Sequence, residues 1–377
     1  MSPPMPSPTS QLATNAGERH KAPIAVGYWL LAVSALLVAM VLVGGATRLT
    51  DSGLSITEWR PVTGAVPPLS DAGWLEEFEK YKQIPEYREV NEGMSLTAFK
   101  TIYWWEWGHR FLGRVIGLAF FIPLAIFWIA GRLPRALKPR LVLLLAMGGA
   151  QGALGWFMVK SGLTERVDVS QYRLAAHLSL AFAILGLMWW TALDVLRGAA
   201  ASPWRFERSF LTLTVVLVAL AYLQIALGGF VAGLKAGLTF NTWPLMDGGI
   251  APPGYWDLNP WYTNFFENYG AVQFNHRLGA YALLALAWLV AWRAMRAPAS
   301  PQIKRWAGGA AAAVTFQAIL GIWTLLAVSP LALALPHQGG AIVVFLLSIG
   351  LAHQAALERG PRAAVEPSAA APQPASA

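Results

Sequence analysis

The chain has 377 residues, of which 56% are hydrophobic and only 13% are charged. A soluble domain of this length cannot bury so much apolar surface, so the composition predicts an integral membrane protein. The chain has no cysteine, which excludes disulfides, iron–sulfur clusters and thiolate-bound metals. Histidine is the strong metal ligand that remains.

Eight apolar segments are long enough to cross a bilayer, which takes about 20 residues per helix. We therefore expect an all-α membrane protein with eight transmembrane helices rather than a β-barrel, whose strands would be short and alternating. In chain order, the segments are 24–47, 109–130, 141–159, 174–193, 210–232, 273–292, 306–328 and 337–357.

The basic residues are distributed unevenly between the two sides of the predicted membrane. The short connections 131–140 and 293–305 each contain four basic residues and no acidic residue. Such connections lie on the cytoplasmic side, which places both termini there. This bias accounts for the net charge of +8 without a nucleic-acid partner. The ends, 1–22 and 359–377, are expected to be disordered cytoplasmic tails.

The two halves of the chain repeat one another. Any one match could arise by chance, but the matches share one order, which favours a duplication. We expect two tandem four-helix bundles that run in the same direction, 23–200 and 201–358, because four helices return the chain to its starting side. Gly44-Gly45, Gly53-Leu54 and Trp59 recur 184 positions later as Gly228-Gly229, Gly237-Leu238 and Trp243.

The long connections 54–105 and 238–272 lie on the outer side in this topology. Within the first, 71–83 is predicted to form an amphipathic helix at the membrane interface. The second is rich in aromatic residues that suit the headgroup region. Both connections are candidates for lids over the outer ends of the helices or for simple interfacial belts. The predicted apolar face of the helix comprises Trp74, Leu75, Phe78 and Tyr81.

Four of the six histidines stand at the first turn of alternate apolar segments. They therefore lie at one depth near the outer face, two in each half. Imidazole binds zinc, copper or iron, but a structural zinc site would gather four ligands in one place, whereas two separated pairs suit two hemes with axial histidines. His20 and His353 break the pattern and are interpreted as non-ligands. The four candidate ligands are His109, His177, His276 and His337.

Three arginines lie beside these histidines. Arg110 and Arg277 directly follow a candidate ligand, and Arg114 lies one turn deeper. An arginine inside a membrane needs a partner, and heme propionates would supply one through charge-assisted hydrogen bonds. The alternative is that these side chains extend towards lipid phosphates.

One substitution distinguishes the halves. Glu106 precedes His109 by three residues, whereas Gln273 occupies the equivalent position before His276. A carboxylate can accept a proton or stabilise a developing positive charge, and an amide cannot. The first half is therefore predicted to be reactive and the second to hold a fixed redox centre. Alternatively, Glu106 caps its helix or pairs with Arg110.

Residues 24–357 resemble the heme A synthase family, whose members oxidise heme O to heme A. The resemblance implies that the N-terminal histidine pair, His109 and His177, holds heme O and that the C-terminal pair holds heme b. Glu106 would then serve the oxidation of a ring methyl to a formyl group through a hydroxymethyl stage. Some members carry a cysteine pair in the first outer connection, which this chain lacks. The resemblance rests on the stretches Glu106-Trp-Gly-His109-Arg110, Asn275-His276-Arg277 and 53–59, together with His177 and His337.

Two other functions share part of this pattern. A di-heme b-type cytochrome that exchanges electrons with quinone would need the histidines and arginines, but it gives no reason for the carboxylate in one half alone. A heme transporter would show polar residues at the membrane midplane, where these helices are apolar. For the synthase we expect a bacterial inner membrane, the lipid bilayer, and an electron acceptor or donor of unknown identity. A heme O synthase and a second copy of the chain are further candidate partners.

Overall fold

The computed structural model describes residues 22–165, 167–197 and 207–359. These residues form helices without a β-strand, and eight of the helices are long and apolar enough to cross a membrane. The predicted all-α membrane class is therefore confirmed. The predicted tails lie outside the described residues, apart from residues 22 and 359. The predicted boundary between the halves, at residues 200 and 201, also lies outside them. The eight helices are α2 (Ile24–Leu49), α5 (Leu96–Ile129), α6 (Lys138–Glu165), α7 (Gln171–Arg197), α8 (Arg208–Gly233), α10 (Tyr269–Arg296), α11 (Pro301–Leu326) and α12 (Leu331–Leu357).

The long helices after α2 begin before the apolar segments from which they were predicted, so the histidines do not stand in the first turn. The largest difference is in α5, which begins at Leu96 rather than at His109. The Ser95 side chain caps this helix by accepting a hydrogen bond from the Ala98 amide, which satisfies a donor that the helix itself leaves free. The outer end of α5 therefore extends beyond the apolar segment and carries the first outer connection.

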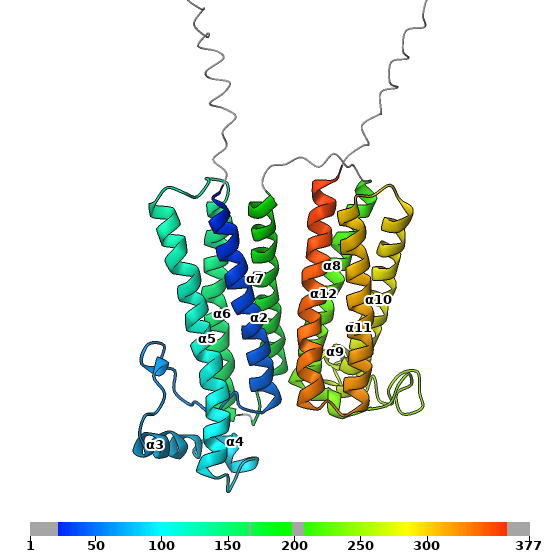
Figure 1. The fold of residues 1–377 in the computed structure, drawn as a ribbon. Helices are drawn as coiled ribbons and strands as arrows, with labels where there is room; N and C mark the ends of the chain where they lie inside the picture. Colours follow the sequence, from blue (N-terminus) through cyan, green and yellow to red (C-terminus); the bar gives the residue numbers. More distant parts are fainter. Residues whose placement is uncertain (1–21, 166, 198–206, 360–377) are drawn as a thin grey trace, which may run out of the picture.

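Each half packs its four helices in the same order. In the first half α2 and α6 each contact both α5 and α7, and in the second half α8 and α11 each contact both α10 and α12. The helices α5 and α7 are therefore diagonal partners, as are α10 and α12. The halves meet where α7 contacts α8 and α12, and where α2 contacts α12 (Figure 1). This shared order is what a duplication would produce, and the duplication itself stays a prediction.

The start of α2 and the end of α12 lie at one end of the helix array, and the long connections lie at the other (Figure 1). The connections contain short helices, of which α3 covers the outer part of α5. Their bounds are η1 (Thr63–Ala65), α3 (Asp71–Tyr81), α4 (Pro85–Glu89), η2 (Ala236–Leu238), η3 (Trp261–Thr263) and α9 (Asn264–Glu267).

The predicted amphipathic helix is present as α3. Trp74, Phe78 and Tyr81 are buried, and Phe78 stacks on Phe99 of α5 with ring centroids 4.9 Å apart. The prediction was wrong for Leu75, whose side chain is exposed. Residues four and seven positions apart share a narrow helix face, and Leu75 lies on the flank of that face. The aromatic face of α3 therefore packs against protein.

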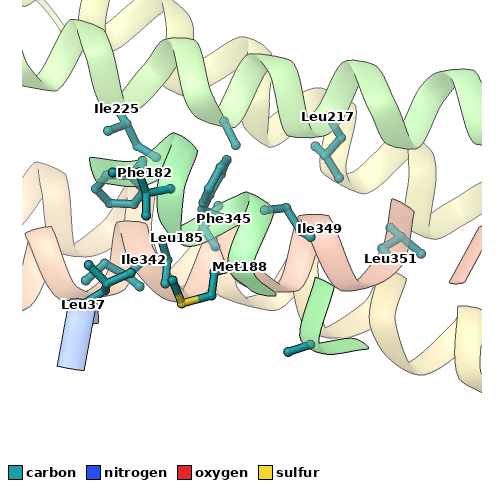
Figure 2. Close-up of a cluster of buried hydrophobic side chains, with 14 of the residues drawn as sticks. Leu37, Phe182, Leu185, Met188, Leu217, Ile225, Ile342, Phe345, Ile349 and Leu351 are labelled. Carbon is teal, nitrogen blue, oxygen red and sulfur yellow. The ribbon is translucent and has the colours of Figure 1, made fainter. Parts of the chain in front are cut away.

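The halves are joined by a buried apolar core at their shared interface, formed by α2, α7, α8 and α12 (Figure 2). Phe345 of α12 lies at its centre, edge-on to Phe182 of α7 at 5.5 Å between centroids. Gly186 of α7 lets these helices approach, because a methyl group in its place would lie 3.1 Å from the Phe345 ring. Inside a bilayer, such close packing replaces the hydrophobic effect as the source of helix association.

We expect Phe345→Ala to lower the free energy of unfolding by about 3 kcal/mol, because it leaves a cavity that the surrounding helices cannot fill. The matched control is Phe316→Ala on α11, since that side chain is 64% exposed in the protein and faces the space that lipid fills. The measurement is the unfolding midpoint in mixed detergent micelles. Equal midpoints for the two variants would contradict the importance of this core.

Candidate functional site

The four candidate ligands lie on the four helices that are diagonal partners. His109 is on α5 and His177 on α7, while His276 is on α10 and His337 on α12. Within each half the two imidazoles are within electrostatic range of one another. The structure therefore brings the histidines together in the predicted pairs. Among the described residues no three histidine or carboxylate side chains converge as in a compact metal site.

A glycine on a neighbouring helix faces each imidazole. A methyl group built on any of these glycines would lie 2.7–3.2 Å from a ring atom of the histidine. At Gly321 the approach of 2.7 Å is closer than real side chains pack, and at the other three positions the ring would have to shift by a few tenths of an ångström, so glycine leaves the most space for the ring at all four. The pairs are Gly44 with His109, Gly155 with His177, Gly228 with His276, and Gly321 with His337.

Glu106 is buried and anchors the segment that follows α2. Its Oε2 accepts hydrogen bonds from the Ser55 hydroxyl at 2.8 Å and from the Ile56 amide at 2.7 Å. Its Oε1 accepts one from Arg110 Nη2 at 2.6 Å, and the same guanidinium donates to the Ile56 and Glu58 carbonyls. The pairing with Arg110 that the sequence left open as an alternative is therefore present.

The second half repeats this geometry with reversed hydrogen-bond polarity. Gln273 donates through Nε2 to the carbonyls of Ala236 and Thr239, and its Oε1 accepts from Arg277 Nη2 at 2.8 Å. Arg277 also donates to the Phe240 carbonyl, and Phe240 stands 184 positions after Ile56. The two outer segments are thus held alike, but the side chain that anchors the segment is a carboxylate in the first half, one turn before His109, and an amide in the second half, one turn before His276.

The arginines retain free hydrogen-bond donors. Arg277 Nε and Nη1 are buried without a partner among the described residues, as is Arg114 Nη1. Arg277 lines a largely apolar cavity of about 360 Å³ with Phe274 and Tyr281. Arg110 and Arg114 line a second cavity of about 210 Å³. Each cavity could therefore receive an anionic group at the arginine, although Arg110 and Arg114 already bind backbone carbonyls of the first outer connection.

His353 lies at the opposite ends of the helices and takes no part in these pairs. Its Nε2 is 2.8 Å from Asp194 Oδ1, and Arg140 forms an ion pair with the same carboxylate. These contacts join α6, α7 and α12 at that end of the helix array. The interpretation of His353 as a non-ligand agrees with this position.

Comparison with known proteins places the chain among assembly factors of a respiratory enzyme. Residues 27–349 match the model of the COX15-CtaA family, described as "Cytochrome oxidase assembly protein". The chain belongs to this family. Curated relatives named "Heme A synthase" include the proteins of Parvibaculum lavamentivorans, 53% identical over 88% of this chain and 94% of the relative, and of Methylobacterium sp. (strain 4-46), 55% identical over 89% and 94%. A third, from Chelativorans sp. (strain BNC1), is 50% identical over 92% and 94%.

Family membership implies a heme-related substrate and cofactor for the protein, and the eight helices make the chain a multi-pass membrane protein. Sequence reasoning did not identify three glutamines that contact the histidines. Each lies one turn before one of the glycines: Gln151 before Gly155, Gln224 before Gly228, and Gln317 before Gly321. Their recurrent spacing from glycine was a signal available in the sequence.

A buried carboxyl group, Glu86, was also missed. It lies in α4 outside the membrane-spanning helices, is 4% exposed, and its Oε2 has no partner among the described residues. Burial, followed by repulsion from Glu106, Asp51 and Asp168, raises the pKa of Glu86 to about 8. The hydroxyl of Tyr81 also faces it, and its hydrogen bond opposes this shift. Glu86 is therefore protonated at neutral pH in the folded chain.

The raised pKa makes the stability of the outer connection depend on pH. The pKa of an exposed glutamate carboxyl is near 4.5. Between that pH and about pH 8, Glu86 is therefore ionised when the segment opens but protonated when it is folded. Stability should therefore fall as the pH rises through this window and level off above it. Hydrogen exchange of α3 and α4, corrected for the intrinsic rate, should show less protection at pH 9 than at pH 6. Glu86→Gln should abolish the difference, whereas Glu79→Gln, a change at an exposed carboxylate, should leave it intact.

Proposed function

We propose that this protein is a heme A synthase, which oxidises a ring methyl of heme O to a formyl group through a hydroxymethyl intermediate. The observation that carries the proposal is the charge difference between two otherwise matched histidine pairs. Glu106 places a carboxylate one turn before His109 on α5, whereas Gln273 places an amide one turn before His276 on α10. A cytochrome that only passes electrons has no use for this difference.

The second half suits heme b as a resident cofactor. His276 and His337 would hold it, because they lie on the diagonal helices α10 and α12 within electrostatic range of one another. The free donors of Arg277 fit a propionate, since they are buried without a partner among the described residues. When bound, heme b would supply reversible one-electron chemistry.

The first half suits heme O as the substrate. His109 and His177 would bind it, and Arg110 or Arg114 would meet its propionates at the outer side. Arg114 Nη1 is the donor free for this contact. Several aromatic and aliphatic side chains of α5 are exposed to the surroundings, which suits a substrate with a long isoprenoid tail that enters from lipid.

Glu106 contributes a fixed negative charge at this site. Oxidation of a methyl group develops positive charge on the carbon and releases protons, and a buried carboxylate stabilises the first and accepts the second. The Ser55 hydroxyl and the Ile56 amide fix the orientation of the carboxylate. Arg110 compensates the charge of the carboxylate in an apolar environment through a direct ion pair.

The electrons removed from the substrate need a path to the second half. Gln338, which follows His337, donates a hydrogen bond of 2.8 Å to the Val41 carbonyl on α2. The adjacent turn of α2 carries Gly44, which faces His109. A continuous packed and hydrogen-bonded route therefore joins the two histidine pairs.

The bacterial relatives and the charge of the short connections support an inner-membrane location with both termini in the cytoplasm. The histidine pairs would then lie near the periplasmic face. The identity of the electron acceptor, a contact with a heme O synthase and self-association stay predictions.

The pigments of the purified protein test this function. We expect heme b together with heme O, its hydroxylated form or heme A, identified by mass after extraction. Glu106→Gln should keep heme b and lower heme A formation by at least about 100-fold, because the amide cannot take up the proton or the positive charge. Heme b alone, in two equivalents, would indicate the di-heme cytochrome instead.

Ser55→Ala is the control that separates catalysis from anchoring. It removes one hydrogen bond from the carboxylate and leaves the charge in place. Heme A formation should largely survive in this variant. If Ser55→Ala and Glu106→Gln lose activity equally, Glu106 acts only by holding the outer segment.

The glycines that face the histidines offer a second test. Gly321→Ala should weaken heme b binding about tenfold or more, because its methyl group would lie 2.7 Å from Cε1 of His337. Gly309→Ala on the same helix, where the methyl group meets nothing within 4 Å, should retain full heme b content. The measurement is the reduced-minus-oxidised absorbance per protein. Full occupancy in Gly321→Ala would contradict the assignment of His337 as a ligand.

A further inference from the structure

The two halves differ in how closely their second and third membrane-spanning helices pack. In the second half α10 and α11 contact one another extensively, whereas in the first half α5 and α6 contact one another at few positions. Only 6% of the apolar stretch of α6 is buried, compared with 28% for its counterpart α11. Because the halves otherwise share one helix order, the loose seam between α5 and α6 is a difference within a repeated architecture.

The seam is closed at its outer end and open further in. Val159 of α6 packs against the aromatic cluster that includes Phe99 and Tyr103 of α5. Gly152 and Gly148 lie seven and eleven residues before Val159, so they share its helix face and point towards α5 deeper in the membrane. A methyl group built on either glycine meets nothing within 4 Å.

The repeat allows the two seams to be compared position by position. Gly155 and Gly321 stand 166 positions apart and align α6 with α11. His109 and His276 stand 167 positions apart and align α5 with α10.

A hydrogen bond and a buried valine close the seam of the second half. Trp288 Nε1 of α10 donates to Thr315 Oγ1 of α11 at 3.1 Å, and Val314 beside it is buried in the apolar core. In the register of the repeat, the counterparts of Val314 and Thr315 are Gly148 and Gly149. The first half therefore has no side chain at the two positions of its third helix that close the second half.

The second helix of the first half does not compensate for these glycines. Phe121 takes the place of Trp288, has no N–H group to donate, and is 52% exposed. Gly148 lies seven residues, or about 10 Å, from Gly155, which faces His177. The seam therefore opens about two turns inward of the first histidine pair.

The surroundings of the seam suit a hydrocarbon chain. Neither α5 between residues 115 and 129 nor α6 between residues 141 and 159 carries a charged residue. A heme with a long isoprenoid tail can enter a four-helix bundle only if the tail has a way out between two helices, whereas a heme without a tail can occupy a closed bundle. The open half is the one with the carboxylate of Glu106, and the closed half is the one that suits heme b.

We propose that the seam between α5 and α6 is a lateral slot for the isoprenoid tail of the substrate, and that Gly148 and Gly149 make the first site accept a heme with a tail. The same slot lets the substrate enter from lipid and the product return to it. This inference rests on the proposed function, because it assumes that the first half binds heme O.

Copying the closure of the second half into the first tests the slot. Phe121→Trp combined with Gly149→Thr places the side chains of Trp288 and Thr315 at the seam. The measurement is the affinity of the purified protein in lipid vesicles for added heme O and for added heme b, after the second site has been filled with heme b. Heme O should bind the double variant at least about tenfold more weakly, because its tail meets the new side chains. Heme b should bind the first site of both proteins within about twofold.

A matched control and a reverse variant complete the test. Ala150→Thr adds the same side chain to an exposed position on another face of α6, so it should bind heme O as the unaltered protein does. Trp288→Phe combined with Thr315→Gly opens the second seam and should let the second site accept heme O. In every variant the heme b spectrum of the second site reports that the protein is folded.

Three results would overturn the slot. They are an unchanged heme O affinity in the closed variant, an equal loss for heme O and heme b, and normal heme O binding in vesicles with loss of heme A formation only in cells. The last result would assign the seam to a partner protein. If neither heme binds the first site of the unaltered protein, the proposed function itself fails.

Discussion

Each candidate ligand occupies space that a glycine on the neighbouring helix leaves open, and the rest of the structure depends on this close approach. An imidazole at this position can turn its nitrogen into the bundle only if the adjacent backbone carries no side chain. A methyl group at Gly321 would already lie 2.7 Å from His337. The four-helix order of each half then places the two histidines on diagonal helices. Helix packing thus produces a space with a ligand on either side.

The halves share this geometry and differ in the groups around it. The arginine that follows each outer-helix ligand binds the same backbone carbonyl in the two outer connections, at Ile56 and Phe240. One turn before that arginine, the first half has a carboxylate, Glu106, and the second half has an amide, Gln273. This change leaves the first half with more negative charge, as expected of a site where chemistry occurs.

Much of the fold followed from apolar length and periodicity, because a bilayer requires long runs of apolar residues that satisfy their own backbone hydrogen bonds. The helix boundaries were less accurate. The outer part of α5 is polar and aromatic, and it is helical because Ser95 caps it and α3 packs along it. Such support comes from segments distant in the chain, which hydropathy does not register. The prediction that Leu75 is buried was wrong because the helical repeat alone does not show how wide the buried face of a helix is.

The histidine pairs, the arginines and the carboxylate could be selected from the sequence alone, since ionisable residues in apolar helices are costly and therefore few. Their roles depended on neighbours that only the tertiary structure supplies. Arg110 and Arg114 proved to hold backbone carbonyls of the first outer connection, and Glu106 proved to bind both Arg110 and that connection. By itself the sequence determined that the chain is a membrane protein with two pairs of candidate heme ligands, because composition and residue spacing do not depend on how the helices pack. Only the folded helices decided which glutamine meets His177, His276 or His337, because those contacts join different helices within each bundle.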